Sequence, residues 1–316
     1  MFAALFNGLF PTARGRGRKN HCVTSEIGPT LPVAQGRCHG LRRPEEATDS
    51  FHFVSCFTCL MSLHGPLIAR MDEIGKRLVA KDDERQHFHL AYLHSTKAVM
   101  DDVDADRFVD SAWVERWGLA FAELYLDAYD IWERGGDPSG PWRVAFEASR
   151  DPEIPPVRHA LLGINAHINY DLPQAFLAVI SDDEFDAEEI MERRAADHAH
   201  VDSILVRRVR QEDKNLQRVE DPGDRTIVDR LMTPFNRAGT RKFLKEGREK
   251  VWRNAGVLSA ARRLGPAVYT RELARLEQLS RDRVADLVTP RYVLVGLARH
   301  GFGVVLPPPW PSDQTL

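Results

Sequence analysis

The chain has 316 residues, of which 43% are hydrophobic and 28% are charged, and its formal net charge is −3 at pH 7. This composition is typical of a soluble globular protein that can bury a substantial core, and the balance of charge predicts neither a nucleic acid nor an anionic membrane as a partner. No apolar run approaches the roughly 18 residues that a membrane span needs.

The first sixty residues differ in character from the rest of the chain. The cysteines all lie there, as Cys22, Cys38, Cys56 and Cys59, among segments rich in arginine, glycine and proline. Cys56 and Cys59 have the spacing of zinc ligands, but the other possible ligands are scattered through turn-forming sequence. We therefore predict that residues 1–60 are a disordered leader or an over-extended gene start. The remaining chain needs no disulfide and fits the reducing cytoplasm, where we expect the protein.

From Ser62 onward the hydrophobic spacing is helical, and no convincing strand pattern appears before the C-terminal tail. We predict an all-α fold, with a single multi-helix, bundle-like domain over residues 61–305 and a short flexible tail over residues 306–316. Helices are expected at residues 65–80, 83–100, 113–134, 156–170, 173–180, 187–210, 224–235, 240–263 and 266–299, the last with breaks.

Two of these helices carry histidines on their apolar arcs. In the second predicted helix, His87 and His94 are expected to face inward, and His89 to point elsewhere. In the sixth, His198 shares an arc with apolar residues, whereas His200 is turned away. Since residues on one helical arc meet the same neighbours, His94 and His198 are candidates for a site inside the domain.

The third predicted helix is rich in aromatic residues. They share one broad arc and comprise Trp113, Trp117, Phe121, Tyr125 and Trp132. A central packing helix explains such an arc, and so does the lining of a pocket for an apolar ligand. Both interpretations stay open.

The run from Pro155 to Pro173 is the most informative stretch of the sequence. Prolines suit the first turn of a helix, so a helix is expected to begin near Pro156. Its polar side chains are His159, His167 and Asp171 on one arc of roughly 120°, and Asn165 and Asn169 as an i, i+4 pair on another side. The other residues are mostly apolar, which predicts burial, and each polar group buried without a partner costs roughly 2–7 kcal/mol.

Two functional hypotheses account for these polar residues. In the first, a small-molecule substrate is processed by a metal-dependent hydrolase or oxygenase-type enzyme that uses zinc, iron or manganese. Its metal ligands would come from His159, His167, Asp171, His198 and His94, with His167 and Asp171 catalytic and Asn165 and Asn169 binding the cofactor. In the second, the chain is a non-enzymatic ligand-binding or structural module with an architectural polar core. Asp171 and Gln174 would then form a capping box at the next helix.

Other common chemistries lack their motifs in this sequence. There is no Gly-x-Ser-x-Gly, and no cysteine follows residue 60, so a serine or cysteine nucleophile has little support. There is also no Walker A loop and no Gly-x-Gly-x-x-Gly, which disfavours nucleotide hydrolysis and dinucleotide redox chemistry.

A family resemblance rests on the same stretch. The run Ala160-Leu161-Leu162-Gly163-Ile164-Asn165-Ala166-His167-Ile168-Asn169-Tyr170-Asp171-Leu172-Pro173 resembles the signature of a bacterial family catalogued as domain of unknown function 5995. The resemblance extends more loosely from about Met61 to Gly301. It implies a helical domain, but it implies no particular reaction.

Overall fold

A computed structural model of the chain describes residues 63–219, 227–289 and 303–308, which all belong to one compact unit. Within these ranges the regular structure is entirely helical, without a strand, which confirms the predicted all-α fold. The leader predicted at residues 1–60, with its cysteines, lies outside the described residues. None of the described helices is long and apolar enough to cross a membrane.

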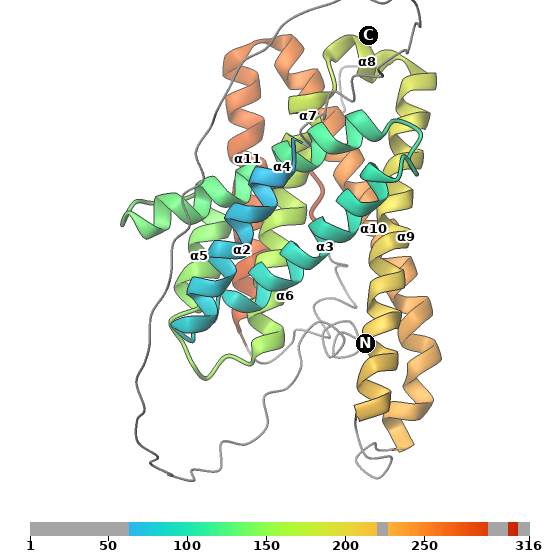
Figure 1. Cartoon of the computed structure of the whole chain (residues 1–316). Coiled ribbons are helices and arrows are strands. Elements are labelled where there is room, and N and C mark those ends of the chain that lie inside the picture. Colours follow the sequence, from blue (N-terminus) through green and yellow to red (C-terminus); the bar gives the residue numbers. More distant parts are fainter. Residues whose placement is uncertain (1–62, 220–226, 290–302, 309–316) are drawn as a thin grey trace, which may run out of the picture. The chain divides into compact units, whose positions relative to one another are not determined.

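Most of the predicted helices are present, with shifted ends. The elements are α2 (Gly65–Ala80), α3 (Gln86–Asp104), α4 (Ser111–Glu133), α5 (Gly140–Ala148), α6 (Pro156–Ala166), the π-helical turn η1 (His167–Asp171), α7 (Leu172–Val179), α8 (Asp182–Asp186), α9 (Glu188–Val219), α10 (Ile227–Leu264) and α11 (Pro266–Val288) (Figure 1). The two helices expected between residues 224 and 263 are the single helix α10, which lies beside α9. Neither α5 nor α8 was predicted.

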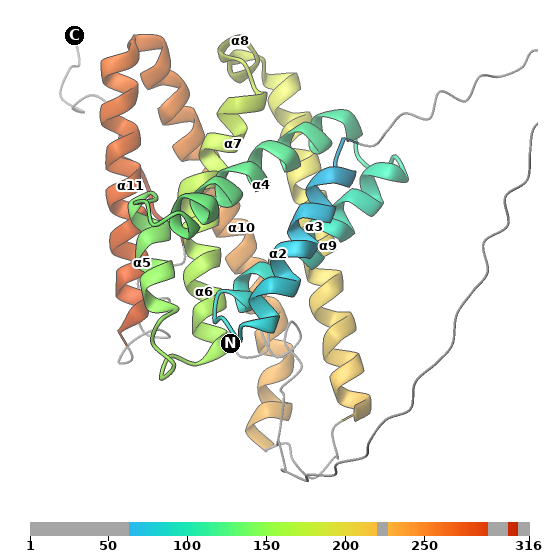
Figure 2. The same cartoon turned by 60° about the vertical axis from the view of Figure 1, so that its left-hand side comes forward.

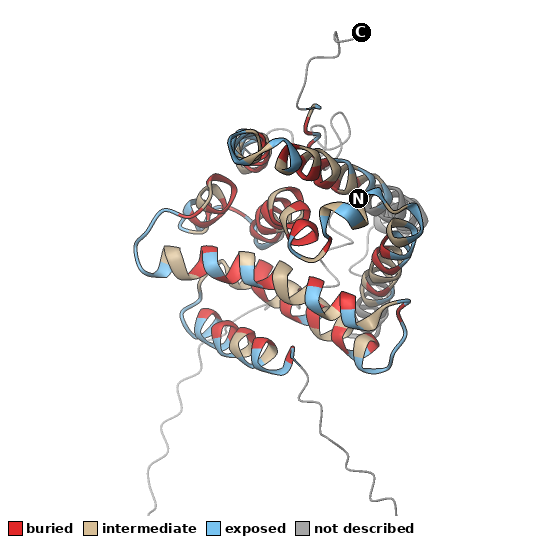
Figure 3. Ribbon diagram, turned by 90° about the horizontal axis from the view of Figure 1, so that it is seen from above, coloured by how far each residue is buried: buried red, intermediate tan, exposed pale blue. Residues whose placement is uncertain are grey.

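The elements α6, η1 and α7 follow one another without a break and form one helical column (Figure 2). The outer helices carry buried residues on one side and exposed residues on the other, whereas the column is buried nearly all round (Figure 3). The buried residues form two cores. The first core includes Met71, Leu78, Tyr125, Trp142 and Leu162, and the second core includes Trp113, Trp117, Phe176, Leu258 and Leu306. Both α4 and the column contribute residues to both cores, so the column connects them.

Helix α5 was missed because Asp137-Pro138-Ser139-Gly140 is typical of a loop. Its helical signal begins one residue later, with Pro141 in the first turn. The apolar residues that follow have the spacing of a buried helical face. They include Trp142, which is 1% exposed and packs in the first core. The missed helix therefore brings an indole N–H into the interior.

The close approach of α3 to α6 depends on Gly163. A Cβ atom at this position would lie 2.3 Å from Cγ of Phe88, which is too close for any real contact. Because glycine has no Cβ, the Phe88 side chain can lie directly against the α6 backbone. This contact brings the aromatic residues of α3 to the column.

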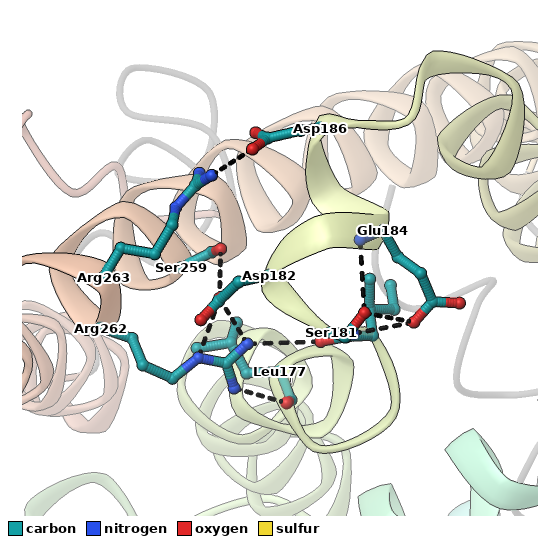
Figure 4. A network of polar contacts seen from close by, with 9 residues as sticks. Leu177, Ser181, Asp182, Glu184, Asp186, Ser259, Arg262 and Arg263 are labelled. Atoms are coloured by element: carbon teal, nitrogen blue, oxygen red, sulfur yellow. Dashed lines mark hydrogen bonds and ion pairs between the residues drawn. The ribbon is translucent and has the colours of Figure 1, made fainter.

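A polar network fixes the C-terminal end of the column against α10 (Figure 4). Arg262 donates to the carbonyl of Leu177 at 2.9 Å and, through Nη2, to Oδ1 of Asp182 at 2.7 Å. Ser259 donates to the same Asp182 oxygen at 2.9 Å. The last carbonyls of a helix have no partner within the helix, so Arg262 satisfies one of them and anchors α7.

Candidate functional site

The column contains one turn of π-helix, His167–Asp171, where an α-helix was predicted. The backbone continues directly into α7, and Asp171 makes no capping hydrogen bond. Gln174 donates to the carbonyl of Tyr170 at 2.8 Å and does not reach back to cap a helix start. The capping-box interpretation is therefore wrong, because the helix does not begin anew at Leu172. Isolated π-helical turns occur frequently at functional sites.

A histidine and an aspartate pair inside this turn. Nδ1 of His167 lies 2.9 Å from Oδ2 of Asp171, and Nε1 of Trp142 donates to the same oxygen at 2.8 Å. His167 is 3% exposed and Asp171 is 2% exposed. The carboxyl group thus orients the imidazole, and the indole orients the carboxyl group. Trp142 was not predicted to take part, because its helix was missed.

Aromatic rings enclose His167. The ring of Phe121 stacks on the imidazole, with centroids 3.6 Å apart and an interplanar angle of 5°. Tyr92 meets it edge-on, with centroids 4.4 Å apart. Three further rings, from Phe88, Tyr125 and Trp142, have centroids 5.7, 6.2 and 6.0 Å from that of His167. The aromatic arc predicted on α4 therefore contributes to an enclosure around a polar group.

Burial shifts both titratable groups of the pair toward their uncharged forms. It lowers the pKa of His167 well below its usual value. It also raises the pKa of Asp171 well above its usual value, although the hydrogen bond from Trp142 acts in the opposite direction. An uncharged pair consists of a protonated carboxyl group and a neutral imidazole. The other ring nitrogen of His167, Nε2, is buried and makes no hydrogen bond within the described residues.

The asparagines form a second polar group, which contacts the backbone at Val304. Asn165 donates to the carbonyl of Leu161 at 3.2 Å, and Asn169 donates to Oδ1 of Asn165 at 3.0 Å. Oδ1 of Asn169 accepts a hydrogen bond from the backbone N–H of Val304 at 3.1 Å. These contacts are made with protein groups. The cofactor-binding role predicted for the two asparagines stays a prediction.

Two histidines predicted to join the site lie in other surroundings. His159 is buried near the start of α6, where its Nε2 is 3.7 Å from Oε2 of Glu84. His198 is buried in the second core, with ring centroids 5.2 Å from Trp117 and 5.4 Å from Phe176. The structure thus brings together His167 and Asp171, but neither His159 nor His198 joins them.

The histidines of α3 correct the predicted orientation of that helix. His94 is exposed, whereas His89 is fully buried and contacts the Tyr125 hydroxyl at 2.9 Å and the Met71 carbonyl at 2.7 Å. Helix α3 packs against α2, α4, α6 and α9, so a single inward arc does not describe it. On α9 the prediction is confirmed, since His198 is buried and His200 is only half-buried.

Metal binding requires several ligands at one point. In residues 63–219, 227–289 and 303–308, no three His, Cys, Asp or Glu side chains are grouped so that they could hold a metal ion. The pair of His167 and Asp171 supplies two such groups. It is therefore a hydrogen-bonded dyad in the part of the chain that the structure describes.

Comparison with known proteins identifies the family. A family model described as a family of unknown function, DUF5995, matches residues 65–290. The comparisons with curated proteins and with solved structures found no match. The matched region includes α2 to α11 and the whole column, and it covers well over half of the 316 residues. The chain therefore belongs to the DUF5995 family.

Proposed function

We propose that the protein is an enzyme that transfers a proton at Nε2 of His167, with Asp171 as the partner that receives or returns a proton at Nδ1. The observation that carries the proposal is the relay from Trp142 to Asp171 to His167, which ends in a buried ring nitrogen without a hydrogen bond in the described residues. Buried polar atoms that lack a partner are rare in native proteins and are found at catalytic groups.

The relay accounts for each proton. In the resting, uncharged pair, Asp171 holds a proton on Oδ2 and donates it to Nδ1, so the imidazole proton is on Nε2. When Nε2 gives its proton to the substrate, Nδ1 takes the proton of Asp171. The resulting carboxylate keeps the hydrogen bond from Trp142 at 2.8 Å. The return of the substrate proton reverses both transfers, so the dyad serves as general acid and general base.

The surroundings of the dyad favour a small, uncharged substrate. Aromatic rings form the enclosure, and an ion moved there from water would lose far more hydration energy than an uncharged molecule. The substrate needs one oxygen or nitrogen atom that can accept a hydrogen bond from Nε2. The metal-dependent form of the enzyme hypothesis stays a prediction.

A matched pair of substitutions tests the proposal. His167→Asn keeps an amide group near the position of Nδ1, where its oxygen can accept from Asp171, and removes Nε2. His198→Asn makes the same change at another buried histidine. Both variants and the wild type would be assayed with a panel of small esters, lactones, epoxides and ketones. We expect His167→Asn to lower kcat by about 10²- to 10⁴-fold and His198→Asn to leave it nearly unchanged. Equal turnover by the two variants would contradict the proposal.

A second measurement does not depend on a known substrate. In ¹⁵N spectra of histidine-labelled protein, we expect His167 to be a neutral imidazole with its proton on Nε2 at pH 7. The reason is that burial disfavours charge on both members of the pair. A charged imidazolium at pH 7 would rule out the resting state on which the relay depends.

The alternative function is a purely architectural polar core. It is favoured by the asparagine pair, whose hydrogen bonds join the column to the end of the chain. In that case His167→Asn and His198→Asn should both lower the stability and should not differ in any turnover. The same two variants therefore separate the alternatives.

A further inference from the structure

The segment Gly303–Pro308, here called the strap, is held by side chains that bind its backbone. Nδ2 of Asn254 donates to the carbonyl of Val304 at 3.0 Å, and Oδ1 of Asn254 accepts from the N–H of Leu306 at 2.8 Å. Lys250 donates to the carbonyl of Gly303 at 3.2 Å. The amide of Asn254 thus takes the place that the peptide group of a neighbouring strand would occupy.

The side chains of the strap alternate as in an extended chain. Val304 is 8% exposed, Val305 is 36% exposed and Leu306 is 0% exposed. Leu306 was assigned to a flexible tail from the sequence, but it is fully buried in the second core. The backbone contacts and the buried leucine together fix the strap on the helical body.

A continuous series of amide contacts connects the strap to η1 and α6. The N–H of Val304 donates to Asn169, Asn169 donates to Asn165, and Asn165 donates to the carbonyl of Leu161. Asn169 lies in η1, between His167 and Asp171 in the sequence. A π-helical turn contains one residue more than the α-helix requires, so it persists only where its surroundings hold it. The strap supplies one such contact directly to the turn.

We infer that Asn169 and Asn254 are positioning residues, through which the docked strap holds η1 in the geometry that pairs His167 with Asp171. Release of the strap allows η1 to relax, and the hydrogen bond of the dyad is weakened. The inference rests on the proposed function for the role of the dyad. The positioning of His167 and Asp171 by the strap does not depend on that role.

One substitution in the strap can release it without altering the helical residues that bind it. A Cβ atom at Gly303 would lie 2.7 Å from Cδ and 3.2 Å from Cβ of Lys250, so Gly303→Val opposes docking. Val305→Ala, at the exposed neighbouring position, is the matched control. Asn254→Leu removes two strap contacts from the side of α10 and leaves both the strap and η1 unchanged in sequence.

The experiment uses the full chain and two spectroscopic readouts. Amide hydrogen exchange at Val304 and Leu306 reports whether the strap is docked, and the ¹⁵N signals of His167 report the state of the dyad. We expect Gly303→Val and Asn254→Leu to speed exchange at least about tenfold and to shift the His167 signals. Val305→Ala should change neither readout.

Each outcome decides the inference. Faster exchange with unchanged His167 signals would show that the strap does not position the dyad, and unchanged exchange in both variants would show that these contacts do not hold the strap. Neither result bears on proton transfer, which is tested by the turnover of His167→Asn. Conversely, shifted His167 signals with full turnover of His167→Asn would keep the positioning and refute the proposed function.

Discussion

Two buried histidines differ in their polar surroundings, His167 in the column and His198 in the second core. They are 3% and 5% exposed, and aromatic rings surround both. The difference is the polar partner. His167 has a carboxyl group at 2.9 Å, whereas Nδ1 of His198 makes no hydrogen bond within the described residues. Aromatic burial alone therefore does not define a reactive imidazole.

Burial lowers the pKa of both histidines, but among the described residues only His167 has an acid beside it. Burial, together with the positive charge of Arg248, lowers the pKa of His198 to about 3. His198 thus stays a neutral imidazole and does not take up a second ring proton. At His167 the neighbouring acid can hold one, because a protonated carboxyl group beside a neutral imidazole carries no net charge. In the proposed function, the acidic partner is what allows His167, and not His198, to exchange protons.

The largest effect is expected from removing that partner. Asp171→Ala should lower the free energy of unfolding by about 3–5 kcal/mol, because it leaves two buried groups, Trp142 and His167, without their shared hydrogen-bond partner. Urea unfolding measures this change. Asp171→Asn is the control, since its carbonyl oxygen can still accept from Trp142, and it should lose about 1–2 kcal/mol. Equal losses in the two variants would mean that the hydrogen bonds contribute little.

A smaller effect is expected from adding one methyl group at a closely packed glycine and at an open one. Gly163→Ala should lower the stability by about 1–3 kcal/mol, since the new methyl group would overlap the ring of Phe88. At Gly256, in the middle of α10, an added methyl group would meet no atom within 4 Å beyond its own helix, so Gly256→Ala should raise stability by about 0.5–1 kcal/mol. Thermal unfolding of the two variants would compare a close helix contact with an open helix face. A stabilising Gly163→Ala would contradict the close approach of α3.

The smallest effect concerns acid. The pKa of His198 is about 3 in the folded protein and about 6.5 when it is unfolded, so its contribution to stability is complete above pH 6.5 and is lost as the pH falls toward 3. Between pH 7.5 and pH 5.5 the loss should be about 1 kcal/mol. His89, whose pKa burial lowers to about 4, should add a similar loss.

Denaturant unfolding at the two pH values checks this prediction. His198→Gln should reduce the slope of stability against pH by its own share and leave the share of His89. An unchanged slope would show that His198 is more accessible to water than its burial implies. The result would then remove the main electrostatic contrast with His167.

Contacts within one helix could be predicted from the sequence. The pairing of His167 with Asp171 and of Asn165 with Asn169 follows from the i, i+4 spacing, and the structure has both pairs. The burial of their helix followed from its apolar composition. Local spacing determines such neighbours because the backbone geometry of a helix is nearly constant.

Contacts between helices were harder to predict. Trp142 reaches Asp171 from a helix whose start has the sequence of a loop, and Asn254 reaches the strap from the middle of α10. His89 is buried in place of His94 because α3 has neighbours on several sides. The sequence pattern of one helix does not determine which neighbouring helices pack against it or with which of their faces. These residues are recognisable only from the assembled fold.

The π-helical turn also determines how well this stretch tolerates the loss or gain of a residue. Each residue advances an α-helix by about 100°, so the additional residue in η1 rotates α7 relative to α6 by about that angle. The offset lets α6 present Leu162 to the first core while α7 presents Phe176 to the second. A one-residue deletion between His167 and Asp171 would turn Phe176 away from its core. This stretch can therefore tolerate a change of residue more readily than a change of length.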